Sequence, residues 1–217
     1  MKLQYPLICF DLDGTLVDDT VYIWETLHES FATDPEARAR AHRDYFDGRI
    51  TYPEWFSHDL KLLSAAGATL SRIRSLLDSL RPMEGAVEVM QELRRRGHTL
   101  AIISGSLDIV VDHLFDTSWF RHVLVNRIFF DENGLISGGI PTPYDLKGKA
   151  EGLRYLAKLE SLAPEQTVFI GDNSNDVWIA RAAGLSIAFN CKSDELRQVS
   201  SVEVTKQDIH QLLRLIS

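Results

Sequence analysis

Short runs of apolar residues alternate along this chain with longer stretches in which apolar residues recur every three or four positions. The apolar runs predict strands at 6–11, 98–106, 123–126, the start of 167–176, and 185–190. The longer stretches predict helices at 85–97, 107–115, 145–159, 177–184 and 206–216. Continuous apolar strands that alternate with helices are typical of a parallel sheet covered on both faces, so the pattern predicts an α/β fold.

One long segment lacks any strand pattern. Residues 20–81 are mostly helical in periodicity, and Asp34 followed by Pro35 is a typical helix start. We therefore expect two domains, an α/β core formed by 1–16 and 82–217, and a helical cap formed by 17–81. A hairpin is expected at 127–140, because Asn133-Gly134 is a strong turn signal.

Composition narrows the functional classes. The 217 residues include 31 acidic and 23 basic side chains, for a net charge of −8, which argues against general nucleic-acid binding. No stretch approaches the ~20 apolar residues of a membrane span. The two cysteines, Cys9 and Cys191, favour buried thiols over a disulfide. A cytoplasmic protein without a membrane or nucleic-acid partner is expected.

Polar clusters stand at the ends of three predicted strands. They are Asp11 to Asp13, Ser104 to Ser106, and Gly171 to Asn173. Ligands of open α/β sheets bind at the carboxyl ends of the strands, so these clusters are expected to meet at one edge of the sheet. Asp176 follows Asp172 in a G-D-x-x-x-D pattern and adds a further carboxylate.

The residue types in these clusters suit a transferring phosphoryl group. Up to four carboxylates at close range repel one another, and Mg²⁺ is the hard cation that such oxygen ligands favour. Ser104 adds a hydroxyl donor, and Lys147 or Lys149 adds positive charge. A carboxylate nucleophile would divide a slow hydrolysis into two steps, while a second carboxylate moves the protons.

These motifs resemble those of the haloacid dehalogenase superfamily. "DLDGT" at 11–15 is similar to its first motif, "SGS" to its second, a lysine to its third and "GDNSND" at 171–176 to its fourth. The likeness covers nearly the whole chain and is strongest to the phosphoserine phosphatase-like branch. It implies a Rossmann-like parallel sheet core with an inserted helical cap domain. Asp13 sets the chain apart from the dehalogenases, which lack that second aspartate.

The resemblance also implies a role for each matching residue. Asp11 would be the nucleophile that forms an aspartyl-phosphate, and Asp13 the general acid and base. Asp11, the backbone carbonyl of Asp13 and Asp172 would bind Mg²⁺, with Asp176 in support.

Four further residues would hold the phosphate, namely Ser104, Gly105, Lys149 and Asn175. Lys149 is preferred to Lys147 because its spacing to Asp172, 172 − 149 = 23 residues, fits the branch.

The chain departs from this branch where the substrate's amine and carboxylate are recognised. The glutamate and the arginine of the branch correspond here to Thr20 and Ser57, and neither carries a charge. Burying two unpaired charges would be costly. Trp55 and His58 stand nearby instead, so we expect a different small phosphomonoester, with an uncharged or aromatic part.

The expected function is thus Mg²⁺-dependent hydrolysis of a small-molecule phosphomonoester, with phosphoserine as one candidate substrate, by a monomer or homodimer. Two alternatives remain open from the sequence. One is a phosphomutase or phosphotransferase of the same superfamily, and the other is a non-catalytic binding protein on this fold.

Overall fold

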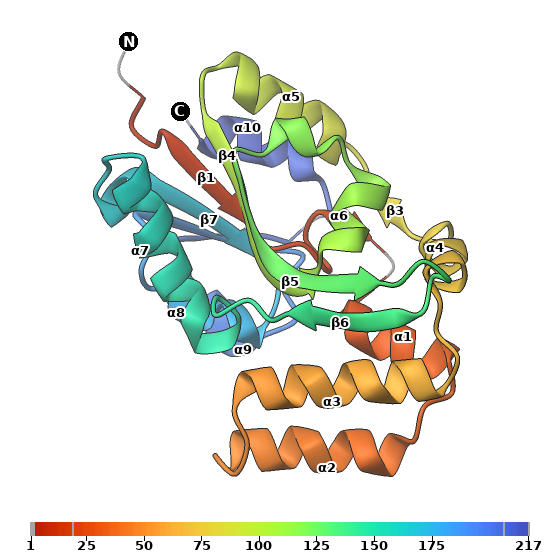
Figure 1. Cartoon of the computed structure of the whole chain (residues 1–217). Coiled ribbons are helices and arrows are strands. Elements are labelled where there is room, and N and C mark those ends of the chain that lie inside the picture. Colours follow the sequence, from red (N-terminus) through yellow and green to blue (C-terminus); the bar gives the residue numbers. More distant parts are fainter. Residues whose placement is uncertain (1–2, 19, 206, 217) are drawn as a thin grey trace.

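A seven-stranded sheet forms the centre of the molecule (Figure 1). The structure is a computed structural model that describes residues 3–18, 20–205 and 207–216. In spatial order the strands are β6 (Ile136–Ile140), β5 (His122–Phe130), β4 (Thr99–Leu107), β1 (Leu7–Phe10), β7 (Thr167–Gly171), β8 (Leu185–Phe189) and β9 (Val202–Val204). All neighbouring pairs are parallel except β5–β6. The parallel α/β core predicted from the apolar runs is therefore confirmed.

Helices cover both faces of this sheet. Alternate residues of β1 point to opposite faces, so Leu7 and Cys9 pack on one side while Ile8 and Phe10 pack on the other. The first side is covered by α7 (Lys149–Leu159), α8 (Val177–Ala180) and α9 (Asp194–Val199). The second is covered by α5 (Ala86–Arg95), α6 (Asp108–Leu114) and α10 (Leu212–Leu215). The central strand is completely buried as a result.

Four helices are inserted after β1, namely α1 (Ile23–Ser30), α2 (Pro35–Phe46), α3 (Tyr52–Ala65) and α4 (Leu70–Leu77). Two short antiparallel strands, β2 (Val17–Asp18) and β3 (Arg81–Pro82), join the two ends of this insert. The predicted boundaries of the cap, at 17 and 81, fall on that ribbon. The status of 17–81 as a separate domain stays a prediction.

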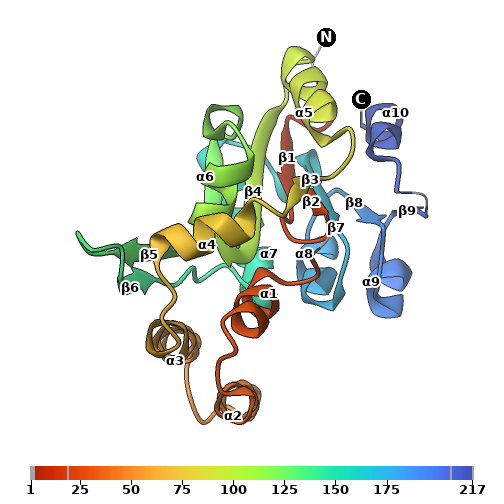
Figure 2. The same ribbon diagram turned by 90° about the vertical axis from the view of Figure 1, so that its right-hand side faces the viewer.

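The predicted helix start at Asp34 and Pro35 is confirmed. The Asp34 side chain accepts hydrogen bonds from the Glu36 and Ala37 amides at the start of α2. Thr51 and Glu54 form a reciprocal capping box at the start of α3. In the view of Figure 2, α1, α2 and α3 stand at the corners of a triangle beneath the sheet.

The β5–β6 hairpin joins the core to the cap. Its turn at Asn133-Gly134 lies against α4, where the Leu70 amide donates to the Gly134 carbonyl at 2.8 Å. The hairpin also packs along α3, which runs beside β6 (Figure 1). The cap therefore rests on an extension of the sheet as well as on the ribbon at its base.

Three local expectations were incomplete. The run at 123–126 is part of one strand, β5, that continues into the hairpin. The segment between β8 and the chain end holds α9 and β9, which the sequence pattern did not indicate. The expected helix at 206–216 is shorter, a 3₁₀ turn at Ile209–Gln211 followed by α10.

Four other 3₁₀ turns connect the elements, at Thr117–Trp119, Leu146–Gly148, Pro164–Gln166 and Ser174–Asp176. In the part of the chain that the structure describes, no helix is both long and apolar enough to cross a membrane.

Candidate active site

The polar clusters predicted at the strand ends meet at one edge of the sheet. Asp11 directly follows β1, and Asp172 directly follows β7, the strand next to it. Ser104 lies within the last part of β4, on the other side of β1. All three side chains are buried. Parallel pairing on both sides of β1 is what brings these distant segments together.

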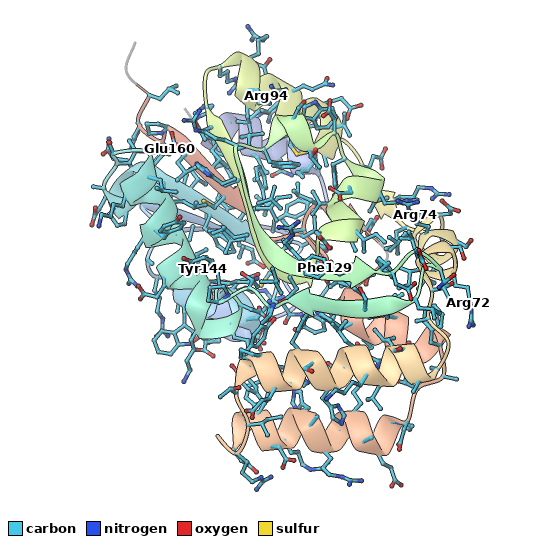
Figure 3. All side chains as sticks on the ribbon, in the orientation of Figure 1. Arg72, Arg74, Arg94, Phe129, Tyr144 and Glu160 are labelled. Carbon is cyan, nitrogen blue, oxygen red and sulfur yellow. The ribbon has the colours of Figure 1, made fainter. Side chains whose placement is uncertain are left out.

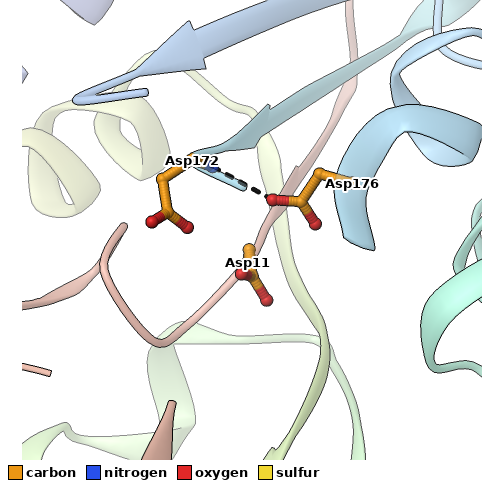
Figure 4. Close-up of side chains that lie close together, drawn as sticks. All are labelled: Asp11, Asp172 and Asp176. Atoms are coloured by element: carbon orange, nitrogen blue, oxygen red, sulfur yellow. Dashed lines mark hydrogen bonds between the residues drawn. The ribbon is translucent and has the colours of Figure 1, made fainter. Parts of the chain in front are cut away.

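Three carboxylates form a compact group there. Asp11, Asp172 and Asp176 each offer an oxygen within 4.8 Å of the others. Figure 4 shows the Asp176 carboxylate accepting a hydrogen bond from the Asp172 backbone amide, at 3.0 Å. Gly171 allows this approach, because a Cβ there would lie 2.3 Å from Asp176 Oδ2. Burial and the charge of Asp11 raise the pKa of both Asp172 and Asp176.

Lys149 lies in the middle of this group, at the start of α7. Its Nζ contacts Asp11 Oδ1 at 2.8 Å and Asp176 Oδ1 at 2.6 Å, and the side chain is completely buried. Burial lowers the pKa of Lys149, but the carboxylates outweigh it, so the pKa lies above its usual value. Lys147 instead stands over the Trp178 ring, 5.6 Å from its centroid. Only Lys149, of these two lysines, contacts the carboxylates.

A second lysine, Lys192, contacts Asp172. Its Nζ lies 2.6 Å from Asp172 Oδ2, and Thr15 Oγ1 donates to Asp172 Oδ1 at 3.4 Å. Lys192 follows the end of β8, so the strand-end rule that selected the other residues could have found it. It was missed because no motif includes it.

The charges at this edge fit a divalent cation. Three buried carboxylates, Asp11, Asp172 and Asp176, contact the two ammonium groups of Lys149 and Lys192, which leaves a surplus of negative charge. These three carboxylates lie close enough together to bind one cation. Oxygen ligands of this kind are those that Mg²⁺ favours. The residues present therefore fit the expected metal.

Asp13 is held apart from that group. Its Oδ2 accepts a hydrogen bond from the Ile23 amide at 2.7 Å, and its Oδ1 accepts one from Ser106 Oγ at 2.8 Å. Burial raises the pKa of Asp13 to about 7, with the charge of Asp11 adding to the effect and the Ile23 bond opposing it. A carboxyl group with such a pKa can both give and take a proton near neutral pH.

The second motif lies beside these carboxylates. Ser104 Oγ accepts a hydrogen bond from the Ser106 amide at 3.2 Å. Gly105 leaves room for Asp145, since a Cβ at this position would lie 2.3 Å from Asp145 Oδ2 and would displace that side chain. Across the site, Asn175 carries a buried side-chain oxygen without a hydrogen-bond partner. Ser104, Gly105 and Asn175 all line the same cavity as Asp11 and Asp13.

Two cap residues form hydrogen bonds with Gly105 and Asp145 of the core. Trp24 Nε1 donates to the Gly105 carbonyl at 2.8 Å, and the Tyr52 hydroxyl donates to Asp145 Oδ2 at 2.9 Å. Asn126 Nδ2 joins the two contacts, because it donates to the Gly105 carbonyl at 2.7 Å and to Tyr52 Oη at 2.9 Å. These cap contacts were not predicted, because they depend on how α1 and α3 dock.

The cavity above the carboxylates has a volume of about 890 Å³ and extends into the cap. Trp55 lines it, and its role in specificity stays a prediction. Of the residues that the structure describes, Thr20, Ser57 and His58 lie outside the lining. Thr20 is buried against Thr26, with 3.0 Å between their hydroxyl oxygens, and Ser57 is exposed on the surface of α3.

Comparisons with known proteins agree with this geometry. The haloacid dehalogenase-like hydrolase family matches residues 5–184. The phosphoserine phosphatase of Methanocaldococcus jannaschii is 29% identical over 220 residues, covering 100% of both chains. That of Archaeoglobus fulgidus is 30% identical over 206 residues, covering 94% of this chain and 57% of its own.

Solved structures lead to the same relatives. A phospho-aspartyl intermediate analogue of phosphoserine phosphatase superimposes with a TM-score of 0.75 at 26% identity, covering 98% of this chain and 99% of the other. A substrate-bound phosphoserine phosphatase complex gives the same TM-score, identity and coverage. The motifs, the sheet with its helical insert and the buried carboxylates thus agree with the comparisons: the chain belongs to the haloacid dehalogenase-like hydrolases, in their phosphoserine phosphatase branch.

Proposed function

We propose that this phosphatase hydrolyses small phosphomonoesters in a Mg²⁺-dependent reaction, with Asp11 as the nucleophile. The observation that carries the proposal is the pairing of Asp11 with a completely buried lysine, beside two further carboxylates. The solved relatives support it, because one of them holds an analogue of a phospho-aspartyl intermediate.

In the first step, an oxygen of the Asp11 carboxylate attacks phosphorus, and the bond from phosphorus to the alcohol oxygen breaks. Lys149 fixes Asp11 and places positive charge beside the transferring group. Asp13 gives its proton to the departing alcohol oxygen. Its raised pKa, about 7, keeps that proton available near neutral pH.

In the second step, water attacks the phosphorus of the aspartyl-phosphate. Asp13, now ionised, takes a proton from this water, and the bond to Asp11 breaks to release inorganic phosphate. Ser104, the Gly105 backbone and Asn175 are placed to hold the phosphoryl oxygens, since all three line the cavity beside Asp11. The cap excludes bulk water through its contacts with Gly105 and Asp145.

The metal would be held by Asp11, Asp172 and the backbone carbonyl of Asp13, with Asp176 in support. When bound, Mg²⁺ neutralises charge that develops on the phosphoryl oxygens. Asp176 also orients Lys149, which it contacts at 2.6 Å.

Phosphoserine is the substrate that the relatives' names give, and it is one candidate here. The positions of Thr20 and Ser57 do not supply the charges that recognise its amine and carboxylate. Charged side chains do line the cavity elsewhere, at Glu25, Glu29 and Arg38. The cap, and not the catalytic edge, therefore decides which alcohol portion is accepted.

The direct test is phosphate release from a panel of phosphomonoesters, with Mg²⁺ and with EDTA. The panel contains phosphoserine, phosphothreonine, sugar phosphates, nucleotides, glycerol phosphate and an aryl phosphate. We expect Mg²⁺-dependent release that Asp11→Asn abolishes, since the amide is nearly isosteric and not nucleophilic. Release that persists in EDTA, or that Asp11→Asn leaves intact, would contradict the proposal.

A further inference from the structure

The cavity continues from Ser104 and Gly105 into a recess within the cap. Its inner wall is formed by Trp24 and His28 of α1, Arg38 of α2, and Trp55, Phe56 and Asp59 of α3. Side chains from α2 and α3 reach into the space between these helices (Figure 3). At about 890 Å³, the whole cavity lies toward the upper end of the ~300–1,000 Å³ typical of sites for drug-sized ligands.

Aromatic rings line the way from Gly105 into this recess. Trp24 is fixed beside Gly105 by its hydrogen bond to the Gly105 carbonyl. Its ring meets the edge of Phe56, with 5.7 Å between centroids, and stacks near His28 at 6.4 Å. An alcohol portion that leaves the phosphate toward the recess must therefore pass flat apolar surfaces. An aromatic ring suits such a passage.

The lining of the recess holds three buried polar atoms without a hydrogen-bond partner among the described residues, Trp55 Nε1, His28 Nε2 and Asp59 Oδ1. Asp59 Oδ1 lies 3.8 Å from His28 Nε2 and 3.8 Å from His58 Nδ1, too far for a hydrogen bond to either. His28 and Asp59 are more than nine-tenths buried, at 3% and 5% exposure. Unsatisfied buried polar groups are costly, so their presence in the wall of a cavity indicates a partner on the ligand.

The charges around this pair restrict that partner. Burial lowers the pKa of His28 to about 4 and raises the pKa of Asp59 to about 7. The positive charge of Arg38 adds to the first shift and opposes the second, and so acts at the same place. Arg38 disfavours a cationic group there, and the Asp59 carboxylate disfavours an anionic one. An uncharged hydroxyl remains, because it can both donate and accept and so can bond the two atoms together, with the directions set by which of Asp59 and His28 carries a proton.

We propose that Asp59 and His28 recognise a hydroxyl group at the far end of an aromatic alcohol portion, so that the substrate is a ring-bearing phosphomonoester larger than phosphoserine. The inference rests on the phosphatase function proposed above and names the substrate class of the same site. Trp24 and Phe56 contact the ring, and the phosphate stays with Asp11.

Matched alkyl phosphates test this without altering the protein. Ethyl phosphate, 2-phenylethyl phosphate and 2-(4-hydroxyphenyl)ethyl phosphate all release a primary alcohol, so their intrinsic reactivities are similar. We expect the ring to raise kcat/KM about tenfold or more through apolar burial. The hydroxyl should raise it about fivefold further through its hydrogen bonds.

One variant isolates the polar end. Asp59→Leu keeps the number and branching of the side-chain heavy atoms and should bring the kcat/KM ratio of the hydroxyphenyl to the phenyl compound close to 1. The control is Lys61→Gln, on the exposed side of the same helix and outside the cavity lining, which should keep the wild-type ratio. If His28 and Asp59 only tie α1 to α3, Asp59→Leu will lower the Tm and leave this ratio unchanged, which overturns the proposal.

The outcomes also separate this inference from the proposed function. If phosphoserine or ethyl phosphate is hydrolysed with a kcat/KM equal to or above that of the ring compounds, the phosphatase stands and the ring-bearing substrate is wrong. If no phosphomonoester releases phosphate with Mg²⁺, the function fails and this inference fails with it.

Discussion

Asp11 and Asp13 stand two residues apart, yet their surroundings suit them to different tasks. Asp11 contacts the buried Lys149 ammonium, which stabilises a carboxylate. Among the described residues, Asp13 accepts hydrogen bonds from two uncharged groups, the Ile23 amide and the Ser106 hydroxyl, and burial raises its pKa to about 7. Such a division between neighbouring carboxyl groups marks one as nucleophile and the other as acid and base.

Asp13→Asn separates the two proton transfers. It should lower kcat by about 100-fold or more with an alkyl phosphate, whose alcohol must be protonated as it leaves. The loss of the first step should be smaller with 4-nitrophenyl phosphate, whose phenolate leaves without a proton. The pre-steady-state release of the two alcohols checks this, and equal losses for both substrates would contradict the role of Asp13 as an acid.

Asp59 should lower stability as the pH rises. Burial raises its pKa in the folded state to about 7, from 3.8, despite the opposing charge of Arg38. The folded state thus holds a proton that the unfolded chain loses, and the free energy of unfolding falls as the pH rises from about 4 to about 7.

Asp59→Asn removes this penalty. The variant should gain stability over wild type at pH 8, by up to ~4 kcal/mol, and gain little at pH 4. Urea unfolding at the two pH values measures the difference. A gain that is equal at both pH values would show that the carboxyl does not titrate in this way.

The strand-end rule predicted which catalytic residues would come together, but not what the cap contributes. Asp11, Ser104 and Asp172 could be placed because parallel strands put their ends at one edge. Thr20 and Ser57, which correspond to the substrate-recognising positions of the branch, lie outside the cavity lining. Asp59 and His28 meet only because α1 packs on α3, and no local pattern encodes that packing.

At the scale of elements, the closed cap depends on polar contacts with the core. Tyr52 of α3 reaches Asp145, and Trp24 of α1 reaches Gly105. The first amide of α1, at Ile23, donates to Asp13. Closure of the cap and the placement of the acid are therefore linked through α1.

Tyr52→Phe should loosen the closed state. It removes the hydroxyl that donates to Asp145, a partly buried carboxyl whose pKa burial already raises, and that accepts from Asn126. We expect kcat/KM to fall about tenfold, mainly because the hydrogen bond to a carboxyl group is lost, and amides of α3 to exchange faster with deuterium. Tyr45→Phe is the matched control, since Tyr45 lies beside Tyr52 in the same aromatic cluster and no hydroxyl hydrogen bond is recorded for it among the described residues. Equal effects of the two changes would show that the Tyr52 hydroxyl has no specific role in holding the cap closed.

Elements with strong local signals were predicted well, and weak ones were missed. The apolar runs of β1, β4, β7 and β8 and the turn at Asn133-Gly134 need no tertiary information. The strand β9 has only three residues, and α9 has six. Such short elements are stabilised by packing against the sheet more than by their own sequence.

At the scale of the whole molecule, negative charge concentrates where the metal is expected. The chain carries a net charge of −8, and Asp11, Asp172 and Asp176 are buried together. A bound divalent cation relieves this repulsion only in the folded state, so it should stabilise the fold by mass action.

Mg²⁺ should therefore raise the Tm. At 100 times its Kd, a ligand adds ~2.7 kcal/mol, which corresponds to a shift of ~5–10 °C for a domain of this size. Asp172→Asn should remove most of the shift, and Asp78→Asn, an exposed acid on the cap, should keep it. Differential scanning fluorimetry with Mg²⁺ and with EDTA measures both, and a shift that Asp172→Asn leaves unchanged would place the cation elsewhere.

The family, its branch and the α/β fold with a helical insert were all predictable, because four motifs follow one another in order, three of them at strand ends. The comparisons confirm them. The substrate was not predictable in the same way, because the cavity is formed by three cap helices whose relative placement is a property of the whole fold.

The central claim is that Asp11 carries the phosphoryl group during turnover. The most direct measurement mixes Asp13→Asn protein with 4-nitrophenyl phosphate and Mg²⁺, quenches the reaction in acid, and determines the mass of the peptide that contains Asp11. The account predicts a phosphoryl group on Asp11, because this variant can form the intermediate but hydrolyses it slowly. Release of phosphate without any phosphoryl group on that peptide, together with retained turnover in Asp11→Asn, would contradict it.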